Sequence, residues 1–255
     1  MRNALLFLVS GILASTPFAA PTSDSLFAVG NAAYDEGNYE LAIEAYEGIL
    51  ATDIWDGHVL YNLGNAHHKA GDLGRAILSY ERALRIMPRS QDLRENLDYL
   101  RVLRKDRLED DTGSAVAQAV DRLVHSLALD EASAILLSLW ILLGLLVSAR
   151  IVTESHERRQ ALGRMATGCL IVFVGSAIHV GMLWSEARRD DGIVVQEEVR
   201  IRSGLGTEYV TEFELHAGIR VTVQRKAGDW IQVALSDELR GWCPAEAVDH
   251  IRVQD

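Results

Sequence analysis

The sequence predicts a multidomain protein: an all-α stack of helical repeats comes first, two transmembrane helices follow, and an all-β barrel ends the chain. Three observations predict this order. A helical pattern recurs at an offset of 34 residues, two long apolar runs occupy the middle, and short β-rich runs alternate with turn residues near the C-terminus. The slightly positive mean hydropathy of a 255-residue chain with a formal net charge of −11 agrees, because it indicates segregated apolar and acidic parts.

The N-terminal residues 1–20 predict a secretory signal peptide. Arg2 precedes the apolar run ALLFLVSGILA, which is too short to span a bilayer comfortably, and Ala19 and Ala20 offer small residues for cleavage. An uncleaved membrane anchor is the alternative. Whether or not the segment is cleaved, the region that follows it is expected on the periplasmic side of the membrane.

Two apolar runs, 132–149 and 165–184, predict transmembrane helices. The first has no charge, and His179 is the only ionisable residue of the second. At about 1.5 Å per residue, each covers close to the roughly 30 Å hydrocarbon core. A pair of buried core helices is the alternative. For His179, a proton relay is weighed against a simple interhelical hydrogen bond, and we favour the latter.

The segment 150–164 between these runs predicts the topology. Short loops rich in arginine stay in the cytoplasm, whereas the outer flanks of the two runs mix both charges. We therefore expect a protein of the bacterial inner membrane with two spans and with both flanking regions in the periplasm. The arginines are Arg150, Arg158, Arg159 and Arg164.

The 34-residue offset aligns SLFAVGNAAYDEGNYELAIEAYEGIL with HVLYNLGNAHHKAGDLGRAILSYERAL. This pattern resembles the tetratricopeptide repeat, with units at 23–56 and 57–90. Small Gly64 lets two helices approach closely. The second copy matches the repeat signature at Leu60, Leu63, Gly64, Ala76, Tyr80, Ala83 and Pro88.

A third helix is expected over 92–108, because its leucines fall on one face and two repeats bury little apolar surface alone. It ends the predicted stack, 23–108. The charged stretch after Arg104 predicts a break between this stack and the next part of the chain. Residues 109–131 predict a linker and an amphipathic helix, which lies either on the membrane surface or on the repeats.

The first helix of each repeat lines the concave groove of such a stack. Asparagine there can bond the backbone of an extended peptide, which predicts a groove for a neutral or basic partner segment. The alternative is that these side chains only cap and bridge adjacent helices. The clamp for C-terminal carboxylates found in some relatives is not carried over, because its cationic positions hold Phe27, Asp92 and Asn96. The predicted groove residues are Asn31, Tyr34, Asn62, Asn65, His68 and Asn96.

The region 192–255 resembles the bacterial SH3-like (SH3b) domain through the phrases VRIRSG, LHAG, GDWIQV and GWCPAEAV. Trp230 and Trp242 are interpreted as hydrophobic anchors of the small barrel, with a ligand platform as the alternative. Cys243 takes an apolar position in this pattern and is expected to be buried and unreactive.

We expect no enzyme, no cofactor and no metal. The sequence has no phosphate loop, nucleophile elbow or paired cysteine motif, and adjacent His67 and His68 point in different directions on a helix. Nucleic acid is not expected as a partner, because no basic cluster is present.

The order of these parts is similar to that of BatE-type proteins of the Bacteroides aerotolerance system. The phrase YNLGNAHHKAGDLGRAILSYERALRIMP carries much of this resemblance. It implies a scaffold for protein–protein interaction in an aerotolerance or envelope-stress complex, with von Willebrand factor A domain membrane proteins and a cytoplasmic MoxR-type ATPase in the same assembly. A cell-wall sensor whose barrel binds peptidoglycan is the alternative.

Overall fold

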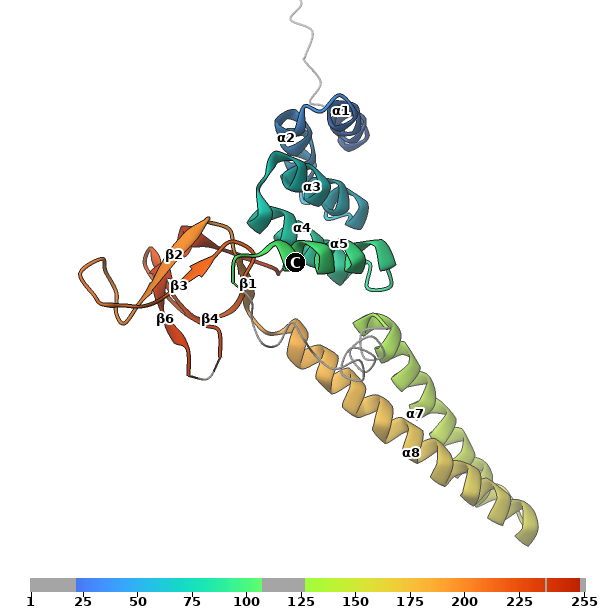
Figure 1. The fold of residues 1–255 in the computed structure, drawn as a ribbon. Helices are drawn as coiled ribbons and strands as arrows, with labels where there is room; N and C mark the ends of the chain where they lie inside the picture. The colour runs from blue at the N-terminus through green and yellow to red at the C-terminus, as the bar shows by residue number, and fades with distance from the viewer. Residues whose placement is uncertain (1–21, 107–126, 237, 253–255) are drawn as a thin grey trace, which may run out of the picture.

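The computed structural model describes residues 22–106, 127–236 and 238–252. A helical stack, a long helical hairpin and a β-sheet follow one another along the chain, and the hairpin projects away from the other two parts (Figure 1). The predicted signal peptide, 1–20, and residues 109–126 of the predicted linker lie outside the described residues.

The helical stack consists of two helical hairpins and one further helix. Helices α1 (Ser23–Asp35) and α2 (Tyr39–Leu50) form the first hairpin, and α3 (Gly57–Ala70) and α4 (Leu73–Ile86) form the second. Helix α5 (Gln91–Leu103) packs on α4. Each helix begins at a side chain that accepts a hydrogen bond from a first-turn N–H. These N-caps are Thr22, Asn38, Asp56, Asp72 and Ser90.

Glycine permits the close approach of the two helices in each hairpin. A Cβ at Gly30 would lie 2.5 Å from the Tyr46 ring, and one at Gly64 would lie 2.5 Å from the Tyr80 ring. Both tyrosines are almost fully buried. The repeated sequence thus gives repeated packing, in which a large ring fills the space that a missing side chain leaves.

The third helix of the stack is shorter than predicted. It buries Leu93, Leu97 and Leu100, but it ends at Leu103 and not at residue 108. Arg104 takes an extended backbone conformation, which turns the chain toward the C-terminal sheet.

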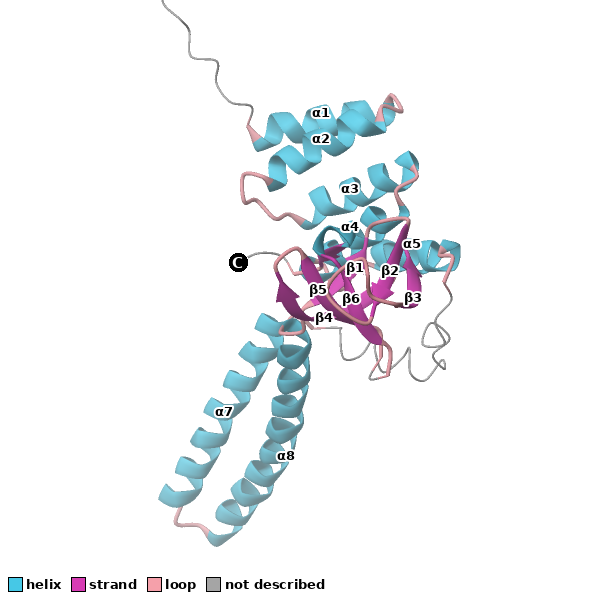
Figure 2. Cartoon of the chain, turned by 90° about the vertical axis from the view of Figure 1, so that its left-hand side faces the viewer, coloured by secondary structure: helices cyan, strands magenta, loops and turns pink. Residues whose placement is uncertain are grey.

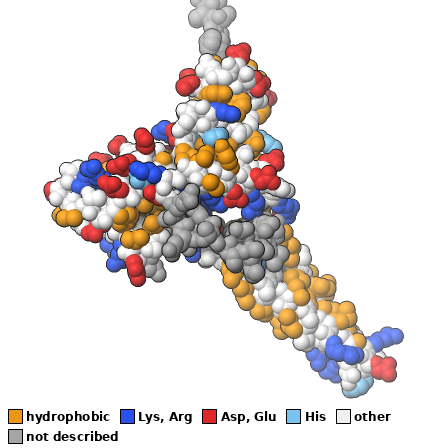
Figure 3. Space-filling model, in the orientation of Figure 1, with side chains coloured by type: hydrophobic (Ala, Val, Ile, Leu, Met, Phe, Trp, Pro, Cys, Tyr) orange, Lys and Arg blue, Asp and Glu red, His pale blue; other side chains and the backbone are white. Residues whose placement is uncertain are grey.

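The hairpin consists of α7 (Leu129–Val152) and α8 (His156–Ala187), which run side by side (Figure 2). Both are long and apolar enough to cross a membrane. The share of the most apolar stretch that is buried inside the protein is 0% in α7 and 6% in α8. Trp140, for example, is 60% exposed. So little burial does not fit core helices of a soluble protein. Figure 3 shows many hydrophobic side chains along the visible face of the hairpin and charged side chains at its far end.

The hairpin helices extend beyond the predicted spans, 132–149 and 165–184. The predicted loop 150–164 is mostly helical, because only residues 153–155 separate α7 from α8. Helix α8 begins before its apolar run, because the segment HERRQALGR contains several good helix formers. Hydropathy therefore located the apolar segments but not the ends of the helices.

The C-terminal region forms a seven-stranded sheet with the order β3-β2-β6-β5-β4-β1-β7, in which all paired strands are antiparallel. A 3₁₀ turn, η2 (Ala245–Ala247), precedes the last strand. The strands are β1 (Asp191–Val194), β2 (Glu198–Arg202), β3 (Thr211–His216), β4 (Arg220–Ala227), β5 (Trp230–Ala234), β6 (Arg240–Pro244) and β7 (Val248–His250).

The predicted closed barrel is corrected by this topology, because β3 and β7 stand at the two ends of the order. The helical stack engages both ends instead. The backbone N–H of His216 on β3 donates to Asp106 Oδ2 at 2.8 Å, and Arg82 Nη2 of α4 donates to the His250 carbonyl on β7 at 2.6 Å. Edge strands present backbone N–H and C=O groups that lack a partner strand. Here the side chains of Asp106 and Arg82 bind one such group on each edge strand.

The sheet and the stack share one apolar core. Ile193 of β1 and Ile251 after β7 are fully buried in the cluster that contains Leu60, Ile77 and Tyr80 of the stack. The sequence held no information about a contact between the stack and the C-terminal region, and the structure shows that the two pack against each other through α4.

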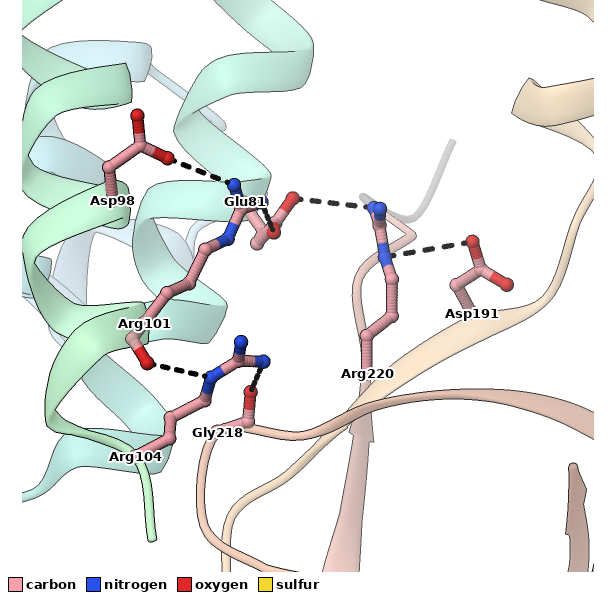
Figure 4. Close-up of polar contacts among 7 residues, drawn as sticks. All are labelled: Glu81, Asp98, Arg101, Arg104, Asp191, Gly218 and Arg220. Atoms are coloured by element: carbon pink, nitrogen blue, oxygen red, sulfur yellow. Dashed lines mark hydrogen bonds and ion pairs between the residues drawn. The ribbon is translucent and has the colours of Figure 1, made fainter. Parts of the chain in front are cut away.

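A buried carboxylate reinforces this contact (Figure 4). Glu81 of α4 lies between Arg101 of α5 and Arg220 of β4, at 3.1 and 3.3 Å. Arg220 also approaches Asp191 at 3.8 Å. Next to this group, Arg104 Nη1 donates to the Gly218 carbonyl at 3.5 Å. The charged side chains at the contact between the stack and the sheet thus have partners of opposite charge or a backbone carbonyl.

Candidate functional site

A pocket of about 280 Å³ lies between the first helices of the two repeats, where the sequence predicts a partner groove. Helix α1 contributes Asn31, Tyr34 and Asp35, and α3 contributes Asn62 and Asn65. Tyr46 of α2 also lines it. Four of the six predicted groove residues therefore surround one cavity.

The asparagines of this pocket belong to two hydrogen-bonded groups. Asn31 Oδ1 accepts hydrogen bonds from Tyr46 Oη at 2.8 Å and from Asn62 Nδ2 at 3.0 Å. Asn65 Oδ1 accepts a hydrogen bond from Tyr80 Oη at 2.6 Å. The two tyrosine–asparagine pairs are equivalent, because both join residues 15 positions apart in successive repeats.

Both tyrosine hydroxyls are protonated at neutral pH, and burial moves their pKa values further above the ordinary value of about 10. It raises the pKa of Tyr46 to about 12, and the nearby negative charge of Asp35 acts in the same direction. Burial also raises the pKa of Tyr80. In the structure these hydroxyls donate to the asparagine oxygens, and Asn62 Nδ2 donates to the same oxygen of Asn31.

This arrangement of the amides determines what the pocket offers to a ligand. The oxygens of Asn31 and Asn65 accept hydrogen bonds from neighbouring side chains, and within the described residues no hydrogen bond from their Nδ2 groups is seen, which leaves these groups as donors. Asn62 uses Nδ2 toward Asn31 and keeps its oxygen as an acceptor. The pocket thus carries donors on both helices and an acceptor on α3, and an extended peptide offers carbonyl and N–H groups that can pair with them.

His68 and Asn96, the other two predicted groove residues, do not line this pocket. Asn96 Nδ2 of α5 donates to Tyr61 Oη at 3.4 Å, and the His68 ring packs edge-on against Tyr99 with 5.9 Å between centroids. The structure therefore places them at the contact of α3 with α5, farther along the stack.

The interpretation that the asparagines bridge helices fits part of this geometry. Each Oδ1 of Asn31 and Asn65 ties its helix to a neighbouring one. These bonds use the amide oxygens and not the amide nitrogens, so bridging is compatible with the predicted binding role. Sequence reasoning missed Asp35 and Tyr46 as pocket residues. The recurrence of tyrosine 15 residues after asparagine in both repeats is the signal that points to Tyr46.

A second pocket, of about 320 Å³, lies on the C-terminal sheet. Trp230 lines it together with Arg200, Arg202 and Pro244, while Trp242 does not. Both tryptophans are half-buried, and they alternate along their strands with the buried residues of β5 and β6. They thus lie on the sheet face opposite the apolar core. The remaining lining residues are Gln196, Glu198, Val199 and Thr207.

Two other singled-out side chains are inside the protein. Cys243 is fully buried in the sheet core, and burial raises the pKa of its thiol to about 12. His67 is buried in the stack, and burial lowers its pKa to about 4. At neutral pH the thiol is protonated and the imidazole is neutral.

Comparisons with known proteins concern the stack. Residues 27–90 match the family model of the tetratricopeptide repeat. Protein O-mannosyl-transferase TMTC1 of Mus musculus is 34% identical over 87 residues, which are 34% of this chain and 9% of the mouse protein. The chain thus spans only a small part of the length of this curated relative. Helices α1 to α4 of the stack thus correspond to tetratricopeptide repeats, which indicates a scaffold for protein–protein interaction.

Proposed function

We propose that the protein is a membrane-anchored adaptor that holds a segment of another protein in the pocket between α1 and α3. The observation that carries this proposal is that Asn31, Asn62 and Asn65 lie around one cavity, where each is held by a hydrogen bond to a neighbouring side chain. Pre-oriented amides lose little freedom when a peptide binds, so they favour binding. Placement within a repeat stack supports the same reading.

The membrane anchor in this proposal is the α7–α8 hairpin, with two spans in a bacterial inner membrane. Its exposed apolar surface and its length support this, since about 36 Å of helix in α7 exceeds the hydrocarbon thickness. Arg150 and Arg158 flank the tip between the helices, which supports a cytoplasmic tip and a periplasmic stack and sheet.

The partner in this proposal is a membrane protein with a von Willebrand factor A domain in an aerotolerance or envelope-stress complex. The similarity in architecture to BatE-type proteins supports this assignment. In the same proposal the C-terminal sheet is an SH3-like module, which the phrases VRIRSG and GDWIQV support. No catalytic step is assigned to the protein.

Photo-crosslinking in intact cells tests the adaptor proposal. A photoreactive residue at position 65 should capture a von Willebrand factor A domain protein, identified by mass spectrometry. The same residue at position 44, which is exposed on α2 and does not line the pocket, is the matched control. Equal capture at both positions, or none at position 65, would refute the groove assignment.

A cell-wall sensor is the second candidate, and the pocket beside Trp230 favours it. An aromatic ring between arginines can stack on a sugar–peptide ligand. Because Ile193 and Ile251 of the sheet region are buried against the stack, the test uses the full chain in detergent. Sedimentation with purified sacculi that is lost in Trp230→Ala, but kept in Trp242→Ala, would support the sensor. Absence of cosedimentation would exclude it.

A further inference from the structure

The inference concerns the chemistry of the segment that the groove accepts, and it rests on the adaptor function proposed above. The first repeat, residues 22–56, contains no Lys, Arg or His. It carries eight carboxylates, all exposed, and none of them takes part in an ion pair within the described part of the chain. They are Asp24, Asp35, Glu36, Glu40, Glu44, Glu47, Asp53 and Asp56.

The pocket itself shares this charge. Asp35 is the only charged residue among its lining side chains, and it lies beside Tyr34 and Tyr46. The nearby ring hydroxyls are neutral. A ligand in the pocket therefore meets one uncompensated carboxylate directly and seven more on the same repeat.

The position of Asp35 opposes a purely structural role. Asp35 is the last residue of α1 and Glu36 is its C-cap, so both carboxylates stand at the negative end of the helix dipole. No basic residue lies in the last turn of α1 or of α2. Negative charges are unfavourable at the C-terminus of a helix. Residues that oppose such a local stability rule are commonly found at functional sites.

We propose that the groove binds an extended, cationic segment of its partner protein. Carbonyl groups of that segment accept hydrogen bonds from the Nδ2 groups of Asn31 and Asn65, and a lysine or arginine side chain pairs with Asp35. The remaining carboxylates of the first repeat attract the segment from a distance, over roughly the 8 Å screening length of physiological salt.

An acidic segment or a free C-terminal carboxylate fits the same groove poorly. Either would place negative charge beside Asp35, and no lysine or arginine lines the pocket to offset it. The clamp positions that are cationic in carboxylate-binding repeats hold Phe27, which packs against Tyr46 at 6.1 Å between ring centroids, together with Asp92 and Asn96.

The experiment uses the full chain in detergent and three fluorescent nonapeptides with blocked ends. The peptides share apolar residues and carry charges of +3, 0 and −3, and fluorescence anisotropy measures their binding. The +3 peptide should bind most tightly, and 0.5 M salt should weaken it. Asp35→Asn should weaken binding about two- to fivefold, the size expected for one exposed ion pair, whereas Glu44→Gln on the outer face should change it less.

Stability provides the second measurement. Because Asp35 opposes the helix dipole, Asp35→Asn should leave the Tm unchanged or raise it while affinity falls. A structural role for Asp35 would instead lower the Tm and the affinity together, which would overturn the assignment.

Asn65→Ala separates this inference from the adaptor proposal. If the neutral or the −3 peptide binds best and Asn65→Ala abolishes that binding, the groove is confirmed and the cationic preference is wrong. If no peptide binds in a way that Asn65→Ala reduces, both proposals are overturned. Tight binding of the +3 peptide that Asp35→Asn and Glu44→Gln weaken equally would show attraction to the whole repeat and overturn the direct Asp35 contact.

Discussion

Glu81 and Arg220 are 139 positions apart in the sequence, yet Glu81 Oε2 and Arg220 Nη2 lie 3.3 Å from each other. The carboxylate belongs to the repeat stack and the guanidinium to the C-terminal sheet. Because the Glu81 side chain is only 8% exposed and Arg101 binds its other oxygen, one residue of α4 joins three elements. This contact makes the stack and the sheet a single structural unit.

Glu81→Ala should destabilise the protein by about 2 kcal/mol, because it leaves two arginines without their shared buried partner. Unfolding of the detergent-solubilised full chain in urea measures the change. Asp98→Asn is the matched control: Asp98 also pairs with Arg101, but its side chain is 73% exposed, so the loss should stay below about 0.5 kcal/mol. Equal losses would contradict the role assigned to burial.

Gly218→Ala should destabilise the protein more than Gly228→Ala. Both glycines have positive φ, +89° and +62°, so alanine strains the backbone at both. Only at Gly218 would the new Cβ lie 2.6 Å from Ile77 Cδ1 across the contact with the stack. Overpacking adds about 1–3 kcal/mol there, and thermal unfolding of the two variants should show the difference. Equal Tm values would mean that the sheet is not packed on Ile77.

His67 should make stability depend on pH. Its native pKa of about 4 lies below the ordinary 6.5, so the unfolded chain takes up a proton first as the pH falls. The stabilisation is complete above about pH 6.5, is lost between about pH 6.5 and 4, and amounts to about 3 kcal/mol. His67→Phe should flatten this part of the urea-unfolding profile, whereas His58→Gln, at an exposed position, should not. An unchanged slope in His67→Phe would refute the prediction.

The hairpin should place its tip in the cytoplasm. A cysteine that replaces Glu157, in a Cys169→Ser background, should resist a membrane-impermeant maleimide added to spheroplasts and react after permeabilisation. A cysteine that replaces Glu44 should react in both states. Cys243 should stay unlabelled, because it is buried with a raised pKa. Labelling of position 157 in intact spheroplasts would reverse the topology.

Local patterns in the sequence predicted the elements but not their assembly. The repeats could be predicted because Gly64, Tyr80 and their counterparts recur at one spacing and pack within a hairpin. The contact of stack and sheet depends on pairs such as Arg82 with His250 and Asp106 with His216, which are 168 and 110 positions apart. Periodicity carries no information about such pairs, so neither the open sheet nor the early end of α5 could be predicted.

The candidate pocket was predictable to a similar degree. The concave side of a repeat stack predicted Asn31, Tyr34, Asn62 and Asn65, because the first helix of each unit lines that side. How the amides are turned could not be predicted, since it depends on hydroxyls from the second helices. Asp35 was missed because an exposed carboxylate at a helix end has no distinguishing pattern.

Only residues 188–190 connect α8 to β1, and β1 lies between β4 and β7 while Ile193 is buried against the stack. At the other side, Arg89 of the stack pairs with Glu131 of α7 at 2.6 Å. The hairpin is therefore joined to the sheet by a short link and to the stack by an ion pair. In the proposed membrane-anchored adaptor, a protein bound between α1 and α3 would be positioned relative to the membrane by the folded unit of stack and sheet, and not by a long connecting segment alone.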